Sequence, residues 1–500
     1  MGNTSTKGIW KVISASSMGT LIEWYDFYIF GSLAVVISTK FFPSDNPTAA
    51  FLSTLATFAA GFVVRPFGAL FFGRLGDLIG RKYTFMATLL LMGGATFLIG
   101  CVPSFETIGY IAPVLVLILR LLQGLALGGE YGGAATYVAE HAPKESRGYW
   151  TSWIQTTATV GLFVSLMVIL ITKNLLSESA FDEWGWRVPF WVSILMVFVS
   201  YLIRKKMHES PEFAKAKAEG KTSKNPLKES FGNKYNLKFV LLALFGATMG
   251  QGVVWYTGQF YAMNFMKTVM NIDSSQVDTL LGIALLLGTP FFVVFGWLSD
   301  KLGRKSIMMT GMLLAILLYR PIYKSMYETV DVKHKTLLSA TPDKSVPDTK
   351  KNQIHLTSYC HYTDGTKMKT VATTSLPKSG SVPEIKTTIT INSHDKWMLV
   401  FLVFIQVIFV TMVYGPIAAF LVEMFPTKIR YTSMSLPYHV GNGIFGGLLP
   451  AISTYFVTNA KANGDPEFYL EGLWYPIVIA FICFVIGMIY LSRKNETIHD

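Results

Sequence analysis

Charged residues are scarce in this chain. Asp, Glu, Lys and Arg make up 15% of its 500 residues, whereas a soluble globular protein carries about 25%. This scarcity argues against an ordinary soluble enzyme, and the sequence contains no evident nucleophile–base pair or cofactor-binding loop. Cysteine is scarce too: Cys101, Cys360 and Cys483 are too few and too scattered for a disulfide framework or a metal cluster. We therefore expect no catalytic residues, no metal site and no cofactor.

Apolar residues are abundant instead. The chain is 51% hydrophobic and 14% aromatic, which excludes a disordered chain. Several apolar runs exceed the ~18 residues that suggest a membrane span. Because open strands cannot satisfy their backbone groups in lipid, we predict an all-α integral membrane protein. Twelve spans are expected, at residues 12–39, 50–72, 84–102, 109–139, 149–172, 186–204, 238–264, 277–298, 305–323, 397–422, 431–457 and 471–491.

A polar segment rich in Lys and Glu divides these spans into two groups. We predict an amino-terminal six-helix half at residues 1–204, a cytoplasmic linker at 205–237 and a carboxy-terminal six-helix half at 238–500. The second half contains a long polar loop at residues 324–395, between the ninth and tenth spans. We expect this loop on the outer side, as a small and partly β domain.

Lys and Arg gather in the amino terminus, in the loops that follow even-numbered spans and in the tail. Positive residues favour the cytoplasmic side, so both termini are predicted to be cytoplasmic. We attribute the net charge of +12 to this topology and expect a lipid bilayer, not nucleic acid, as the surrounding partner. We expect the protein to be a monomer.

A ten-residue motif occurs twice. Residues 73–82 read Gly-Arg-Leu-Gly-Asp-Leu-Ile-Gly-Arg-Lys, and residues 296–305 read Gly-Trp-Leu-Ser-Asp-Lys-Leu-Gly-Arg-Lys, an offset of 223 (296 − 73). A second repeated pair, Glu140 with Arg147 and Glu423 with Arg430, has an offset of 283 (423 − 140). The offset grows by 60 (283 − 223), which identifies the long loop as an insertion into a regular repeat.

These two copies, with Arg120, Gln123 and Gly124 in the fourth span, resemble the major facilitator superfamily over nearly the whole chain. Within it, residues 23–27 (Glu-Trp-Tyr-Asp-Phe), 65–68 (Arg-Pro-Phe-Gly) and 128–133 (Gly-Gly-Glu-Tyr-Gly-Gly) are similar to the metabolite:H⁺ symporters. The resemblance implies two parallel six-helix halves that rock about a midplane site. It also implies uptake of osmolytes, shikimate or di- and tricarboxylates across a bacterial cytoplasmic membrane. The long outer loop departs from the family pattern.

By the same resemblance, the repeated motif is a cytoplasmic gate that favours the outward-facing state. Its glycines allow close helix approach, and its charges can clamp the end of a neighbouring helix. Simple anchoring by positive charge would explain the arginines but not the repeated aspartates. The expected gate residues are Gly73, Asp77, Gly80, Arg81, Asp300, Gly303, Arg304, Glu140, Arg147, Glu423 and Arg430.

Five ionisable side chains fall inside predicted spans, all in the first half: Glu23, Asp26, Arg65, Arg120 and Glu130. Placing a charged side chain in the middle of a membrane helix costs about 2.5–3.5 kcal/mol on insertion scales, so each of these residues is a candidate for a functional or structural role. Glu23 and Asp26 share one helix face, and Arg120 reaches a similar depth. An arginine keeps a carboxylate ionised, and its displacement lets the carboxylate take a proton. The alternative is a static pair that only holds the first and fourth spans together.

The three carboxylates outnumber the two arginines by one (3 − 2). A buried charge without a partner tends to become neutral, so one carboxylate is predicted to be protonated for part of a transport cycle. We expect Asp26 to carry this proton, with Glu23 and Glu130 as further proton-coupling candidates.

The substrate is predicted to be anionic or zwitterionic, because two arginines lie at the expected cavity. The counterparts of the first-half carboxylates are neutral, so the second half is expected to contribute aromatic and amide groups. The predicted substrate-binding residues are Arg120, Arg65, Gln123, Tyr131, Trp255, Tyr256, Gln259, Gln406 and Asn442.

Proton-coupled symport of a small polar metabolite by alternating access is the function this pattern favours. One alternative is a proton-driven exporter of metabolites or drugs, although the fifth span lacks the Gly-Pro kink motif of drug antiporters. Another is a sensor built on a transporter scaffold, for which no cytoplasmic output domain is expected.

Overall fold

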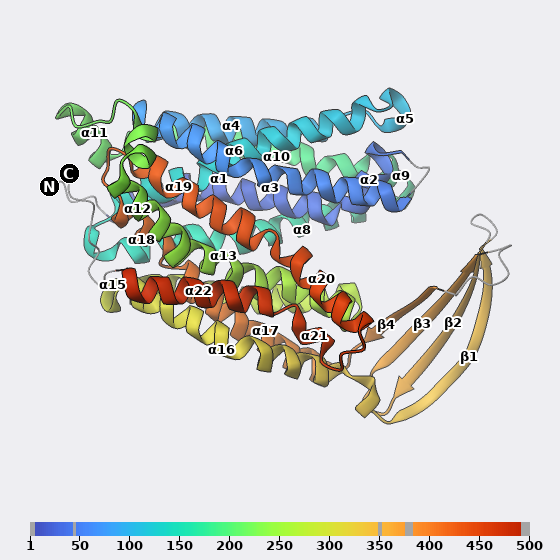
Figure 1. Cartoon of the computed structure of the whole chain (residues 1–500). Coiled ribbons are helices and arrows are strands. Elements are labelled where there is room, and N and C mark those ends of the chain that lie inside the picture. Colours follow the sequence, from blue (N-terminus) through green and yellow to red (C-terminus); the bar gives the residue numbers. More distant parts are fainter. Residues whose placement is uncertain (1–5, 44–46, 349–352, 376–383, 492–500) are drawn as a thin grey trace.

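The apolar runs fold into helices that lie roughly along one axis, with a β-sheet projecting from one end of the bundle (Figure 1). The computed structural model describes residues 6–43, 47–348, 353–375 and 384–491. Its first and last described residues, Thr6 and Leu491, lie at the end opposite the sheet (Figure 1). We call these two ends of the bundle the terminal end and the sheet end.

Ten helical runs among the described residues are long and apolar enough to cross a membrane. An eleventh is the pair α1 (Thr6–Ser32) and α2 (Ala34–Phe41), counted as one span bent by 68°. The twelve-span count therefore stays a prediction, although α3 (Pro47–Leu78) fills the place of the second predicted span.

The other helices of the first half and the linker are α4 (Arg81–Ile99), α5 (Phe105–Ile108), α6 (Ile111–His141), α7 (Arg147–Ser152), α8 (Thr157–Leu175), α9 (Glu178–Glu183), α10 (Val188–Lys205) and α11 (Pro211–Ala218). Those of the second half are α12 (Lys234–Ala243), α13 (Met249–Tyr256), α14 (Ala262–Asn264), α15 (Ser274–Leu302), α16 (Arg304–Val330), α17 (Ser393–Tyr414), α18 (Ile417–Met424), α19 (Arg430–Val440), α20 (Leu449–Ala462), α21 (Phe468–Glu471) and α22 (Trp474–Tyr490).

The helices form two groups that follow the sequence, blue to cyan above and green to red below in Figure 1. The two most extensive packings between the groups are those of α19 on α3 and of α15 on α7. The groups lie closer together at the terminal end than at the sheet end (Figure 1).

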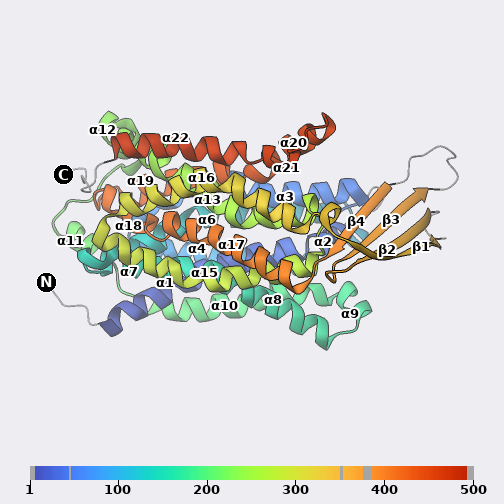
Figure 2. The ribbon, with the colours of Figure 1, turned by 90° about the horizontal axis from the view of Figure 1, so that it is seen from below.

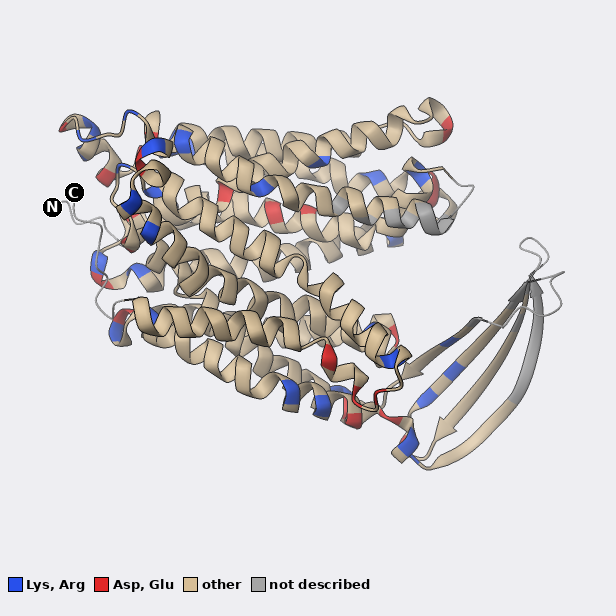
Figure 3. Ribbon diagram, viewed as in Figure 1, with Lys and Arg blue, Asp and Glu red and all other residues tan. Residues whose placement is uncertain are grey.

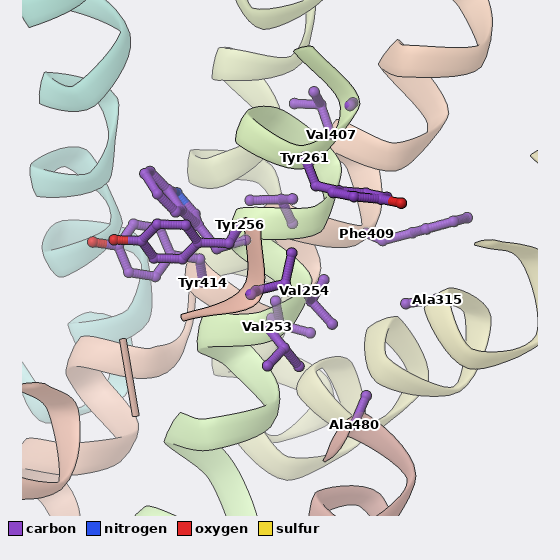
Figure 4. Packing of buried hydrophobic residues seen from close by; sticks show 14 of the residues in the cluster. Val253, Val254, Tyr256, Tyr261, Ala315, Val407, Phe409, Tyr414 and Ala480 are labelled. Atoms are coloured by element: carbon purple, nitrogen blue, oxygen red, sulfur yellow. The ribbon is translucent and has the colours of Figure 1, made fainter. Parts of the chain in front are cut away.

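The apolar core of the second half surrounds α13, which packs against α16, α17 and α22. Val253 and Val254 of α13 are fully buried there, with Ala315 of α16 and Ala480 of α22 close by (Figure 4). Tyr256, further along α13, and Tyr414 of α17 belong to the same core (Figure 4).

Several turns of the second half are π-helical, and a wider turn re-aims the side chains around it. Three follow α12 along one helical run, at Leu244–Thr248, Thr257–Tyr261 and Phe265–Val269. A fourth, Gly441–Gly446, connects α19 with α20. Such turns often occur at functional sites.

The long loop predicted between residues 324 and 395 is shorter than expected, because α16 continues to Val330 instead of ending at residue 323. Ion pairs of Arg320 with Glu471 at 3.4 Å and of Lys324 with Glu467 at 2.9 Å hold this extension. Beyond it lie β1 (Leu337–Asp348), β2 (Gln353–Tyr362), β3 (Lys367–Ser375) and β4 (Glu384–Thr390), an antiparallel sheet in the order β1-β2-β3-β4.

A polar cluster fixes the base of the sheet. The Lys335 ammonium lies 2.7 Å from an Asp364 carboxylate oxygen and also contacts Asp395, at the start of α17. Partial burial alone would raise the pKa of Asp364, but hydrogen bonds from Lys335 and Thr366 outweigh this and lower it to about 2. On the other side of the sheet, the amide of Asp273 donates to the Ile389 carbonyl at 2.9 Å.

Candidate functional site

Charged residues are concentrated at the two ends of the bundle, and those in its middle belong to the first-half helices (Figure 3). Asp26 of α1 and Arg120 of α6 are among them. They form an ion pair of 2.8 Å in which both side chains are almost fully buried. The pairing expected from their depths in the sequence is therefore present.

The side chain of Gln123, one turn after Arg120, forms hydrogen bonds with both members of this pair. Its amide oxygen accepts from Arg120 at 2.7 Å, and its amide nitrogen donates to Asp26 at 2.9 Å and to the Thr96 hydroxyl at 2.7 Å. Because its amide is committed to three protein partners, Gln123 positions the pair; we had predicted that it contacts substrate. Thr96 of α4 was not identified from the sequence.

Glu23 lies one turn before Asp26 on the same face of α1. Its partner is Arg65 of α3, at 3.4 Å, which is a longer contact than that of Asp26 with Arg120. The Arg65 guanidinium stacks over the Phe62 ring at 4.2 Å, and its Nε is buried without a hydrogen-bond partner. This pair is more open than the first, since the Arg65 side chain is 15% exposed.

Glu130 has a partner that the sequence did not suggest. Arg204, at the end of α10, donates to it at 2.5 Å, and the Thr88 hydroxyl donates at 2.7 Å. Arg204 adjoins the polar linker in the sequence, but its side chain is fully buried. The predicted excess of one carboxylate is therefore wrong, because each of the three carboxylates has an arginine partner.

Aromatic side chains join the two halves next to these pairs. The ring centroids of Trp24 in α1 and Trp255 in α13 are 5.0 Å apart, and those of Phe27 and Phe260 are 5.1 Å apart. Trp255, a predicted substrate-binding residue, is thus at the interface of the two halves. Tyr256 and Gln259, predicted for the same role, are buried on the same helical run.

Asn442 and Gln406, two further amide side chains of the second half, were both predicted to bind substrate but lie in different surroundings. Asn442, in the π-turn after α19, forms a reciprocal pair with Gln251 of α13 at 3.0 and 3.1 Å. Gln406 instead points within the second half, where its amide nitrogen contacts the Met326 sulfur at 3.3 Å. The structure gives no support to Gln406 as a substrate contact, because α17 turns this side chain toward α16.

A stack of tyrosines lies between the two halves. Tyr131 of α6 lies flat on Tyr438 of α19, with ring centroids 3.8 Å apart, and the hydroxyls of Tyr414 and Tyr438 share a 2.7 Å hydrogen bond. Gln155 donates to the Tyr131 hydroxyl at 2.7 Å. Tyr131 thus contacts the second half through a neutral aromatic surface.

At the terminal end, the first copy of the repeated motif clamps a helix of the other half. The Asp77 carboxylate accepts from the backbone amides of Tyr431 at 3.3 Å and Thr432 at 2.8 Å, at the start of α19. Arg81 donates to the same carboxylate at 2.9 Å. A carboxylate at a helix N-terminus is stabilised by the unpaired amides and the helix dipole.

The second copy does the same in the opposite direction. The Asp300 carboxylate accepts from the amides of Gly148 at 2.9 Å and Tyr149 at 2.8 Å, at the start of α7 in the first half. Arg304 donates to Asp300 at 2.5 Å and to Glu423 at 3.0 Å. The sequence repeat is therefore also a repeat in geometry, with each half capping a helix of the other.

The glycines of both copies permit these contacts. Gly80 and Gly303, which precede α4 and α16, have φ of +125° and +91°, a region that side chains disfavour. A Cβ on Gly73 would lie 2.9 Å from the Thr432 Cα, so α3 and α19 touch there through their backbones.

A linker residue also contacts the charged residues at the terminal end, which the sequence did not predict. Glu212 of α11 accepts from Arg147 and, at 2.6 Å, from Arg430. Arg430 also reaches Glu140 at 2.8 Å, across the two halves. We call Asp77, Arg81, Glu140, Arg147, Glu212, Asp300, Arg304, Glu423 and Arg430 the terminal cluster.

Within the described part of the chain, no three His, Cys, Asp or Glu side chains gather in a way that could hold a metal ion.

Comparison with known proteins gives consistent matches. The family described as sugar (and other) transporter matches residues 11–238. The α-ketoglutarate permease of Escherichia coli strain K12 is 29% identical over 489 residues, which cover 98% of this chain and 94% of the permease. The inner membrane metabolite transport protein YhjE of the same strain is 31% identical over 458 residues, covering 90% of this chain and 88% of the relative.

Solved structures with this fold also match. The proton:xylose symporter XylE of E. coli superposes with a TM-score of 0.68 at 15% identity, covering 98% of this chain and 97% of that one. At that identity, the match establishes a common fold.

Proposed function

Because the chain belongs to the major facilitator superfamily of membrane transporters, we propose that it takes up a small organic anion or zwitterion together with a proton. The observation that carries this proposal is the closed network of Asp26, Arg120 and Gln123 beside the interface of the two halves. We place it in a bacterial cytoplasmic membrane, with the terminal end on the cytoplasmic side.

Asp26 is the proposed proton carrier. Each of its two carboxylate oxygens accepts a hydrogen bond, one from Arg120 and one from Gln123, so a partner must move before that oxygen is free. A substrate anion that attracts Arg120 would free Asp26, and proton and substrate would then load together.

Arg65 is the proposed substrate arginine. Its contact with Glu23 is longer than that of Arg120 with Asp26, and its side chain is the more exposed of the two arginines. A substrate carboxylate could therefore engage Arg65 first, and the same anion would then draw Arg120 away from Asp26. Trp255, Tyr256 and Gln259 would supply the opposite wall.

The terminal cluster would act as the cytoplasmic gate. Its contacts hold the two halves together at the terminal end, which corresponds to an outward-facing or occluded state of an alternating-access carrier. Inward opening would require these contacts to separate.

Asp26→Asn in reconstituted vesicles tests the coupling. The carboxamide keeps the size of the side chain and one of its two acceptor oxygens, but it cannot titrate. We expect counterflow exchange of substrate to persist, while accumulation driven by an acidic outside falls to the level seen without a pH gradient. Asp278→Asn removes an exposed carboxylate at the sheet end and is the matched control.

The substrate for this assay would come from a thermal-shift screen of organic acids, amino acids and betaines. Continued pH-driven accumulation by Asp26→Asn would exclude Asp26 as the coupling residue. Absence of any counterflow by the unmodified protein would favour a sensor, and outward movement driven by inward proton flow would favour an exporter.

A further inference from the structure

A groove of about 480 Å³ lies between α12 and α22 near the terminal end. Figures 1 and 2 both place these helices side by side there. It opens toward the outside of the bundle, as the exposure of Leu241, Phe245 and Tyr490 indicates. Its lining residues are Lys234, Leu237, Lys238, Leu241, Leu242, Phe245, Ile486 and Tyr490.

Two glycines close the deep end of this groove. Just past Phe245, Gly246 meets Gly487 of α22 so closely that a Cβ on Gly487 would lie 2.6 Å from the Gly246 carbonyl oxygen. The backbones touch at this point, directly beside Phe245 and Ile486, which line the groove.

The lining has a polar end and an apolar end. Lys234 and Lys238 are one turn apart and so share a face of α12. Both are exposed, and neither forms an ion pair with any residue that the structure describes. Another lysine binds the free carbonyls at the end of α22: the Lys305 ammonium contacts those of Met488 and Leu491. Lys234 and Lys238 are therefore not required as donors to these carbonyls.

We propose that this groove binds one anionic phospholipid, with its phosphate between Lys234 and Lys238 and an acyl chain along the apolar wall. Phe245 is seven residues beyond Lys238, which is about 10 Å along the helix at 1.5 Å per residue. That length carries the groove from the headgroup layer into the hydrocarbon. Basic pockets between membrane helices recognise anionic headgroups in this way.

The test uses the full chain in detergent, with native mass spectrometry to count retained lipid. Phosphatidylglycerol is titrated against phosphatidylcholine of identical acyl chains. We expect preferential retention of one phosphatidylglycerol. The double variant Lys234→Gln/Lys238→Gln should weaken it roughly thirtyfold, which corresponds to about 1 kcal/mol per lysine. Lys234→Arg/Lys238→Arg keeps both charges and should retain the lipid.

Lys217→Gln/Lys224→Gln is the matched control, because it removes two exposed linker charges away from the groove. Equal loss of phosphatidylglycerol in this control would overturn the proposal in favour of general charge attraction. Unchanged binding in Lys234→Gln/Lys238→Gln would leave the two lysines with a topological role only. Soluble glycerol phosphate at millimolar concentration should not displace the lipid; if it does, the site recognises free phosphate instead.

Discussion

At the scale of single residues, Gly19 shows how a buried ion pair is accommodated. It lies on α1 beside Glu130 and Arg204, where a Cβ would come within 1.7 Å of a Glu130 carboxylate oxygen and 1.9 Å of an Arg204 nitrogen. The pair therefore occupies the space that a side chain would fill.

Gly19→Ala should disrupt this pair. Breaking a buried ion pair costs about 3–5 kcal/mol, so we expect a large fall in Tm in detergent, or failure to insert. Gly31→Ala on the same helix is the control, because its Cβ would meet nothing within 4 Å. Equal Tm values for the two variants would show that Glu130 and Arg204 contribute little to stability.

The sequence predicted one buried pair well and another not at all. Asp26 and Arg120 could be matched because both lie at a countable depth in long apolar runs. Arg204 could not, since it is followed by Lys205 and Lys206 and looks like part of a solvated basic stretch. Its partner Glu130 is 74 residues away in the chain, and only packing of α10 against α4 and α1 brings them together.

The direction of a side chain was equally hard to predict. Gln406 and Gln251 both occur in apolar helices, yet only Gln251 pairs with a residue predicted at the site, Asn442. A π-turn lies immediately before α13 and another lies at Asn442. Such turns shift helical periodicity, so counting by 3.6 residues fails across them.

At the scale of helices and strands, the two motif copies predict a shared effect. Asp77→Asn removes the charge that caps α19, a contribution of about 0.3–1 kcal/mol at a helix terminus. We expect the uptake rate to change several-fold while substrate affinity stays nearly constant, because the cap lies at the terminal end. Asp300→Asn should act in the same direction.

Initial uptake rates over a range of substrate concentrations separate these two quantities. Asp278→Asn, at the sheet end, should change neither. An Asp77→Asn protein with normal rate and greatly reduced affinity would contradict a gating role for this motif.

The base of the sheet should loosen in acid. The pKa of Asp364 is about 2 in the folded chain, below the ordinary 3.8. Its contribution to stability is therefore complete above about pH 4 and is lost as the pH falls toward 2. Hydrogen exchange of the sheet amides, corrected for intrinsic rates, should accelerate between pH 5 and pH 2.5. Asp364→Asn should exchange faster already at pH 5 and respond less to acid.

Linker residues could not be assigned to the terminal cluster from sequence alone. Glu209 and Glu212 stand in a charge-rich stretch that is typical of solvated loops. In the folded chain Glu209 accepts from the backbone amide of Arg81 at 3.0 Å, and Glu212 bridges Arg147 and Arg430. The motif pattern identified the helices that meet, but not the third segment that joins them.

At the scale of the whole molecule, the sheet is attached to the helices mainly through its base. Deleting residues 338–388 and inserting a short linker should leave transport within about twofold of the unmodified protein, since surface insertions tolerate removal. Extending the deletion through Ile391 should destabilise the protein, because Ile389 and Ile391 belong to the buried core of the second half. Loss of substrate binding in the shorter deletion would place the sheet on the substrate path.

If the terminal end opens as proposed, both reciprocal caps must break. Asp77 closes a helix that belongs to the second half, and Asp300 closes one that belongs to the first. Neither half can swing away and keep its own cap, because both bonds cross the same boundary. If each cap favours closure about fivefold, which is about 1 kcal/mol, the open population is reduced about twenty-fivefold, and removing one cap recovers only fivefold. Under the proposed gating, each copy of the motif would therefore have to release a helix of the other half before the halves separate at this end.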